Sequence, residues 1–172
     1  GTITIPKAKD IPAVLHRGFK GTVKTVTVSM TPSGRYFASI LVDTAIQEQK
    51  TSEPVHDTAI GIDLGIKSLA VCSDGRTFGN PKNLPGSLDR LKVLQKRLSR
   101  KRKGSSNRNK ARIRVARLQE HIANCRKDNL HKITHELTHD NQVRTICMED
   151  LNVKGMQRNR HLAQAVGDAS FG

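Results

Sequence analysis

The fold is decided by residues 59–66, which read AIGIDLGI. An aliphatic side chain occupies every second position, a pattern typical of a β-strand with one buried face. The other face carries Gly61, Asp63 and Gly65, so a single carboxylate stands between two residues without side chains. Glycine weakens a strand, so two glycines around one Asp indicate that a ligand or a metal-bound phosphate approaches Asp63 closely. A solvent-facing Asp, with glycines that serve packing or a bulge, explains the pattern equally well.

Further strands are expected on both sides of this one. Residues 68–72 and 76–78 flank an Asp-Gly turn signal, which predicts a three-stranded meander. Residues 143–150 have an apolar centre that predicts a buried strand, and they end in two acids. A helical crossover before this strand permits its parallel pairing with the first one. Glu149 and Asp63 would then meet at the carboxyl ends of neighbouring strands, where they could share a metal.

The segment between these strands carries most of the charge. The chain of 172 residues has a net charge of +15, and residues 89–132 contain sixteen Lys or Arg against three Asp or Glu. Apolar residues recur at helical spacing over 84–98 and 111–137, which predicts an antiparallel helical hairpin over residues 84–139. Charge of one sign around the hairpin tip favours nucleic-acid contact over a solvated face or a membrane surface. The candidate nucleic-acid-binding residues are Arg97, Arg100, Lys101, Arg102, Lys103, Arg108, Lys110, Arg112 and Arg114.

The residues before position 59 are expected to form a separate β part. Residues 25–30 and 36–42 are rich in β-branched and aromatic side chains and flank a Pro-Ser-Gly turn, which predicts a hairpin. Residues 47–58 are polar and contain a proline, which is typical of a linker. The predicted division is therefore 1–46, the linker, and 59–172.

Composition excludes several classes of protein. No apolar run reaches the ~18–20 residues of a membrane helix, and the start shows no signal-peptide pattern. The sequence has no CxxC pair, so we expect Cys72, Cys125 and Cys147 to be reduced core thiols of a cytoplasmic protein. With one Tyr and no Trp, an interface built on aromatic stacking of bases is not expected.

Four parts of the sequence together resemble the TnpB (OrfB) family of transposon-encoded RNA-guided DNA nucleases, which are relatives of the type V CRISPR effectors and are also called transposases. They are GIDLGI at 61–66, the basic hairpin, HKI at 131–133 and ICMEDLNV at 146–153. The resemblance implies an α/β fold in which residues 59–172 form an incomplete ribonuclease-H-like (RuvC) domain, with a mixed sheet and a long basic helical hairpin. It implies that residues 1–46 are the C-terminal part of a β-barrel wedge domain.

The resemblance also implies roles for individual residues. Asp63 matches the first catalytic acid and Glu149 the second, whereas Asp150 receives no catalytic role. The implied chemistry is phosphodiester hydrolysis with two Mg²⁺ or Mn²⁺ ions, in which Asp63 would bridge both ions and Glu149 would hold one. Guide RNA and target DNA would be the partners, held through their phosphates by the hairpin. We expect a cytoplasmic protein that lies at the nucleoid when bound to DNA.

The family pattern is incomplete in this sequence. The family's third catalytic Asp follows a four-cysteine ribbon that binds a structural zinc, and the sequence ends at Gly172 before both. Asp168 does not match that third acid. We therefore expect weak metal binding and no efficient cleavage by this chain alone.

Two alternatives remain open. One is a nucleic-acid-binding module without catalysis, since the third implied acid is absent. The other follows from HELTH at residues 135–139, which matches the His-Glu-x-x-His helix of zinc peptidases with Glu136 as the base. No third zinc ligand is evident, because Gln142 and Thr145 stand where the extended motif has Gly and His. The sequence gives no oligomeric state.

Overall fold

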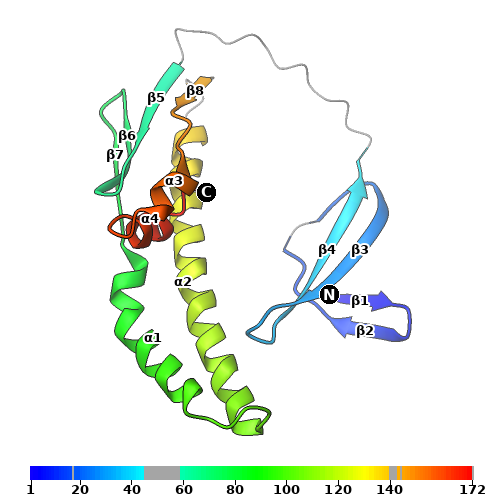
Figure 1. The fold of residues 1–172 in the computed structure, drawn as a ribbon. Coiled ribbons are helices and arrows are strands. Elements are labelled where there is room, and N and C mark those ends of the chain that lie inside the picture. Colours follow the sequence, from blue (N-terminus) through cyan, green and yellow to red (C-terminus); the bar gives the residue numbers. More distant parts are fainter. Residues whose placement is uncertain (17, 45–58, 140–142, 144, 172) are drawn as a thin grey trace. The chain divides into compact units, whose positions relative to one another are not determined.

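The computed structural model describes residues 1–16, 18–44, 59–139, 143 and 145–171 (Figure 1). The chain divides into two compact units, with the main boundary between Lys50 and Thr51. The predicted linker at 47–58 lies outside the described residues. The assignment of residues 1–46 to a wedge domain stays a prediction.

The first unit consists of two small antiparallel sheets. Strands β1 (Thr2–Ile5) and β2 (Ala8–Pro12) form one, and β3 (Thr22–Met30) and β4 (Tyr36–Asp43) form the other. The register of the second pair runs from Thr22 opposite Asp43 to Met30 opposite Tyr36, which confirms the predicted hairpin. Every residue of β3 is exposed, and in β4 the described burial is limited to half-buried Ile40 and Val42.

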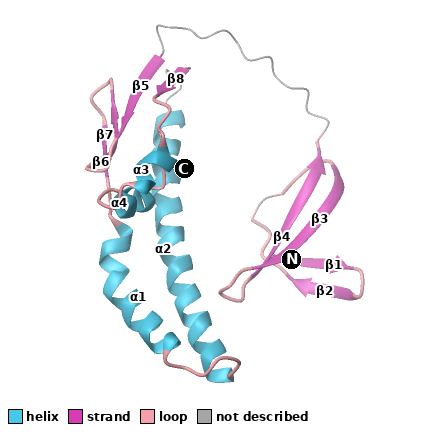
Figure 2. Ribbon diagram, viewed as in Figure 1, coloured by secondary structure: helices cyan, strands magenta, loops and turns pink. Residues whose placement is uncertain are grey.

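The second unit is built on one four-stranded sheet with the order β7-β6-β5-β8 (Figure 2). Its strands are β5 (Ala59–Leu64), β6 (Ser68–Cys72), β7 (Thr77–Gly79) and β8 (Thr145–Met148). The first three form an antiparallel meander, and β8 pairs with β5 in parallel. The fold is therefore α/β with a mixed sheet, as expected, and the ribonuclease-H-like assignment stays a prediction.

Two long helices connect β7 to β8. Helix α1 (Asn83–Ser99) and helix α2 (Ser106–His139) lie side by side as an antiparallel hairpin. Ser105 caps α2, because its Oγ accepts a hydrogen bond from the Arg108 N–H (3.2 Å). Two short helices, α3 (Val153–Arg158) and α4 (Ala163–Ala169), follow β8.

Helix α2 contributes to two separate hydrophobic clusters. Its first half packs against α1 in a cluster of buried Leu91, Val115, Leu118 and Ile122. Its last turns pack against the sheet, where Leu137 is buried with Ile60, Ile62, Ala70 and Cys72. One apolar stripe thus serves two partners, and the second of them is the sheet that carries Asp63.

Residues 143–150 contain the predicted strand, paired in parallel with β5, but the prediction that this strand is buried is wrong. Strand β8 covers only 145–148, and Ile146 and Met148 are 39% and 56% exposed. The physical reason is that β8 lies at the edge of the sheet, with no strand of the described residues on its far side. The expectation of three core thiols fails for the same reason: Cys72 is buried and Cys125 half-buried, but Cys147 is exposed on β8.

Candidate metal centre and nucleic-acid interface

Parallel pairing of β5 with β8 brings the two predicted acids to neighbouring positions. The last paired residues are Ile62 and Met148, so Asp63 and Glu149 each follow directly at the carboxyl end of the pair. The Ile62 side chain is buried on the face of the sheet that packs against α2. Alternation along the strand places Asp63 on the opposite, exposed face. The two carboxylates therefore stand on adjacent strands and can act on one ligand.

Both acids line a single open pocket of about 530 Å³ on this face. Gly61 lines it as well, and its backbone is held by Ser73. The Gly61 N–H donates to Ser73 Oγ (3.0 Å), and the Ser73 N–H donates to the Gly61 carbonyl (2.9 Å). A Cβ at Gly61 would stay 3.7 Å from Ser73, so the backbone does not require glycine there. Its missing side chain instead leaves space beside Asp63.

Gly65 has a different explanation. A Cβ at this position would come within 3.0 Å of the Ser68 carbonyl oxygen, and the Gly65 N–H donates to the Leu69 carbonyl (3.3 Å). The tight turn after β5 therefore favours this glycine. The sequence left two interpretations of these glycines. Close packing explains Gly65, whereas open space for a ligand fits Gly61.

The pocket has the chemistry of a site for hard cations. Carboxylate oxygens are the ligands that Mg²⁺ prefers, and this ion is often held by one or two carboxylates together with water and substrate phosphates. Asp63 and Glu149 fit that donor set. Within the part of the chain that the structure describes, no group of three His, Cys, Asp or Glu side chains could hold a metal ion. Any ion held here would keep several positions for water or phosphate.

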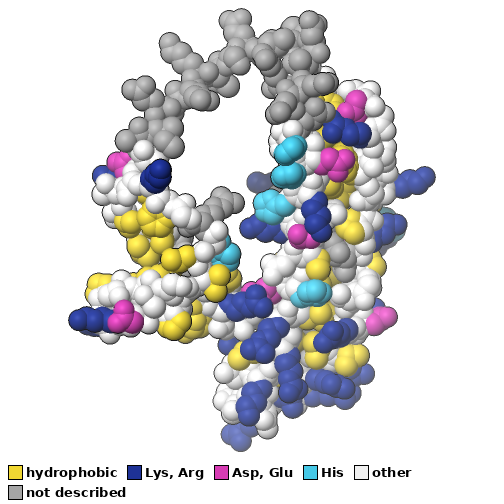
Figure 3. Space-filling view, turned by 180° about the vertical axis from the view of Figure 1, so that it is seen from behind, with side chains coloured by type: hydrophobic (Ala, Val, Ile, Leu, Met, Phe, Trp, Pro, Cys, Tyr) yellow, Lys and Arg dark blue, Asp and Glu magenta, His cyan; other side chains and the backbone are white. Residues whose placement is uncertain are grey.

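The nine candidate nucleic-acid-binding residues lie around the end of the hairpin, where Figure 3 shows Lys and Arg side chains gathered. Four of them line a hollow of about 290 Å³ between the two helices, over Leu94 and Ala111. These four are Arg97, Arg100, Lys101 and Arg114. No ion pair joins any of the nine to a carboxylate among the described residues, so carboxylates do not neutralise their charge.

Two of the nine have partners in the fold. Arg108 donates from Nη1 to the carbonyl oxygens of Leu98 (3.1 Å) and Lys101 (2.9 Å), at the C-terminal end of α1. Its guanidinium thus ties the end of α1 to the connection between the helices, and its predicted phosphate contact stays a prediction. Arg112 donates to the Asn109 side chain (3.1 and 3.2 Å) and stays exposed.

Sequence analysis gave Asp168 no role, and the structure gives it a central one. Its carboxylate is 5% exposed, accepts from Arg126 Nε (2.8 Å), and accepts the Leu84 N–H of α1 with both oxygens (3.1 Å each). The residue at the N-cap of α1, Lys82, makes no side-chain cap. A lysine is a poor N-cap residue. Its presence before α1 is the feature of the sequence that could have indicated a cap supplied by a residue distant in the sequence.

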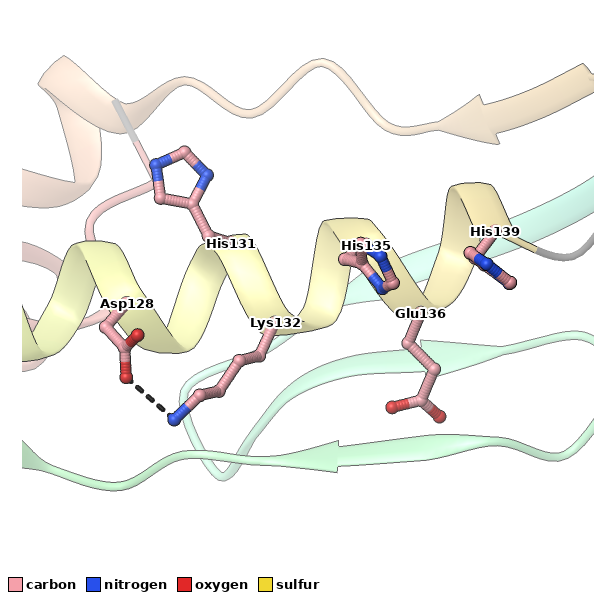
Figure 4. Close-up of a pocket in the computed structure, with 6 residues that line it drawn as sticks. All are labelled: Asp128, His131, Lys132, His135, Glu136 and His139. Carbon is pink, nitrogen blue, oxygen red and sulfur yellow. Dashed lines mark ion pairs between the residues drawn. The ribbon is translucent and has the colours of Figure 1, made fainter. Parts of the chain in front are cut away.

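The His-Glu-x-x-His residues lie in the last turns of α2. His135 and His139 line an open pocket of about 580 Å³ together with Asp128, His131, Lys132 and Glu136 (Figure 4). No third ligand joins the two imidazoles in the described part of the chain. The described residues therefore do not assemble the three-ligand centre of a zinc peptidase.

A family profile described as "Probable transposase" (OrfB_IS605) matches residues 39–160, which is most of the chain. The chain belongs to this OrfB family. Its match includes Asp63, the whole hairpin and Glu149, and it confirms the resemblance drawn from the sequence motifs. No described helix of the OrfB chain is long and apolar enough to cross a membrane.

Relatives of this OrfB chain carry names that state an activity. A protein of Streptomyces pristinaespiralis named "Putative RNA-guided DNA endonuclease" is 43% identical over 86% of this chain and 35% of its own length. The Escherichia coli protein "Putative RNA-guided DNA endonuclease InsQ" is 37% identical over 91% of this chain and 38% of its own length. The chain thus spans about a third of the length of the curated relatives it matches.

Proposed function

We propose that this OrfB chain is part of an RNA-guided DNA endonuclease and carries two acids of its two-metal centre together with a basic hairpin for nucleic acid. The observation that carries the proposal is the parallel pairing of β5 with β8, which sets Asp63 and Glu149 on one open face. The names of the relatives supply RNA and DNA as the partners.

The fold behind this proposal is ribonuclease-H-like. A meander of three antiparallel strands is joined by a helical crossover to a parallel strand beside the first one. Asp63 lies near the carboxyl end of the first strand and Glu149 directly follows the parallel strand, at the end of the sheet where α/β folds bind ligands. This placement supports a RuvC-like site, with Asp63 as the first acid and Glu149 as the second.

Each part of the site has a separate task. Bound Mg²⁺ or Mn²⁺ ions would supply activation of water and stabilisation of the leaving oxygen in phosphodiester hydrolysis. Asp63 and Glu149 would hold these ions through their carboxylate oxygens. Gly61 leaves room beside Asp63 for the phosphate, and the hairpin holds the nucleic acid through its backbone. Base pairing with a guide RNA would supply the sequence specificity.

Mn²⁺ titration of the 172-residue chain tests the metal assignment. We expect binding that is lost in Asp63→Asn and in Glu149→Gln, because each variant removes one of two carboxylate ligands. Asp150→Asn is the matched control, since it removes the same charge at the next residue. Equal loss in all three variants would show nonspecific attraction and contradict the site.

Cleavage is tested with the product of the gene that encodes this sequence, supplied with RNA and a matching DNA. Phosphodiester cleavage that needs Mg²⁺ or Mn²⁺ and disappears in both acid variants is the expected result. Cleavage that survives both substitutions would overturn the two-metal assignment.

A nucleic-acid-binding module without catalysis is the second candidate. It is favoured by the limit of two carboxylates at the described site and by the uncompensated charge of the hairpin. Strong nucleic-acid binding by a chain that shows no Mn²⁺ binding at Asp63 and Glu149 would decide for this candidate.

A further inference from the structure

A pair of histidines on α2 has no part in the nuclease proposal. His135 and His139 are one helical turn apart and therefore share a flank of the helix. Their rings are stacked, with centroids 5.1 Å apart and planes inclined by 27°. Figure 4 shows both imidazoles beside each other, with the Glu136 carboxylate extending from another side of the helix.

Packing does not account for these two imidazoles. The apolar flank of the same turns faces the sheet, where Ile133 and Leu137 contact the cluster around Ile60 and Ile62. His135 and His139 are exposed, and all the described residues that line their pocket belong to α2. The rings can therefore turn toward a common ligand without loss of core contacts.

We propose that His135 and His139 form a chelating site for a borderline transition-metal ion such as Zn²⁺, Ni²⁺ or Cu²⁺. Imidazole nitrogen suits these ions, whereas Mg²⁺ and Mn²⁺ prefer oxygen. A metal–nitrogen bond of about 2.0–2.1 Å lets two imidazoles one turn apart hold a single ion. This site goes beyond the proposed nuclease function and is separate from Asp63 and Glu149.

The described surroundings make this an open site. No third His, Cys, Asp or Glu of the described residues completes a ligand set. The nearby Lys132 is paired with Asp128 (2.8 Å), and that pair keeps the ammonium engaged along the helix. An open two-histidine site binds ions reversibly, and the Irving–Williams order predicts that Cu²⁺ binds more tightly than Zn²⁺.

Bound metal would also restrain the end of α2. Leu137 lies between the two ligands in sequence and is buried against β5, the strand that carries Asp63 on its other face. An ion that links residues four apart holds this turn in helical geometry. We expect amide hydrogen exchange of residues 135–139 to slow when Zn²⁺ or Cu²⁺ binds.

Calorimetric titration of the 172-residue chain with Zn²⁺ and Cu²⁺ tests the site. His135→Gln and His139→Gln keep a polar side chain at an exposed position, and circular dichroism verifies the helix content of each variant. Loss of an outer-shell partner alone costs about 10–100-fold in metal affinity, so each direct-ligand variant should weaken binding at least about tenfold. His161→Gln, a lone exposed histidine outside α2, is the matched control and should bind as the parent does.

Three results would overturn the proposal. The first is absence of Zn²⁺ and Cu²⁺ binding by the parent chain. The second is equal affinity of the parent and the two ligand variants. The third is loss of binding only in His121→Gln, which would assign the ion to His121 and Cys125, whose sulfur and ring nitrogens lie 3.8–3.9 Å apart. None of these results depends on Asp63, on Glu149 or on cleavage, so the nuclease proposal succeeds or fails independently.

Discussion

At the scale of single residues, Asp168 joins three helices through one carboxylate. Asp168 belongs to α4. Its carboxylate accepts a hydrogen bond from the Leu84 N–H in the first turn of α1 and forms an ion pair with Arg126 of α2. The N-terminal end of a helix leaves backbone N–H groups without partners, and a negatively charged carboxylate there also interacts favourably with the helix dipole. These contacts join both helices of the basic hairpin to α4.

Asp168→Ala should lower the free energy of unfolding by about 3 kcal/mol, because it leaves a partly buried guanidinium unpaired and a helix start uncapped. Urea unfolding at neutral pH measures the change. Asp128→Ala is the control: its pair with Lys132 is 65–74% exposed, and such surface pairs contribute about 0–1 kcal/mol. Equal destabilisation by the two substitutions would contradict the assigned role.

The cysteines provide a second prediction at this scale. Cys147 is exposed in the pocket of Asp63 and Glu149, whereas Cys72 is buried in the sheet core. Burial, reinforced by Asp74, raises the pKa of the Cys72 thiol, and the thiolate is the reactive form. A thiol reagent at pH 8 should therefore modify Cys147 quickly and Cys72 only on unfolding.

Ellman's reagent followed over time measures both rates, and Cys147→Ser identifies the fast phase. The bulky adduct at Cys147 should also weaken Mn²⁺ binding, because it occupies the pocket beside Glu149. A fast phase that persists in Cys147→Ser would show that the exposed thiol is another one.

At the scale of elements, the hairpin contains two kinds of arginine. Arg108 caps α1 through two carbonyl oxygens, whereas Arg102 is exposed in the connection between the helices. Arg108→Met should lower the free energy of unfolding by about 1–3 kcal/mol, the range for lost hydrogen bonds to a charged donor. Arg102→Met should leave stability unchanged and weaken nucleic-acid binding.

Thermal unfolding and fluorescence anisotropy with a labelled duplex separate these two effects. The pair is matched in residue type, in substitution and in net charge. A loss of affinity in both variants without any loss of stability in Arg108→Met would contradict its role as a helix cap and support a phosphate contact.

Much of this architecture could be predicted because the spacing of apolar residues along each segment matches the helix or strand that the segment forms. Apolar side chains recur every three or four residues along α1 and α2 and every second residue in β5, and the structure forms those elements. Long-range partners could not be predicted. The Asp168 cap joins residues 84 positions apart, and the exposure of β8 depends on which strands lie beside it.

The candidate site was predictable to the same extent. Asp63 and Glu149 follow from strand alternation plus parallel pairing, which the crossover permits. The contacts of Arg108 could not be predicted, because composition does not show which guanidinium also donates to helix-end carbonyls. The role of Gly65 could not be predicted from the sequence, because the close approach of the Ser68 carbonyl depends on the turn after β5 and not on the strand pattern.

At the scale of the whole molecule, charge is separated from the sheet. Residues 89–132 hold sixteen basic and three acidic side chains, and their helices extend away from the sheet that carries the two acids. A polyanion held by the hairpin through phosphates would displace counterions, and the measured affinity should then depend steeply on salt.

The salt dependence can be expressed in phosphate contacts. If about six of the exposed hairpin cations contact duplex phosphates, the slope of log K against log salt is about −5, and affinity falls about 10³-fold between 50 and 200 mM salt. Each substitution of a contacting residue, such as Arg100→Met or Arg114→Met, should reduce the magnitude of that slope by about 1. Lys24→Met in the first unit is the control: its ammonium is 3.3 Å from the Asp43 carboxylate, and its loss should leave the slope unchanged. A slope near zero, or equal changes in all three variants, would mean that the concentrated charge does not bind the phosphate backbone, and the hairpin would lose its place in the proposed function.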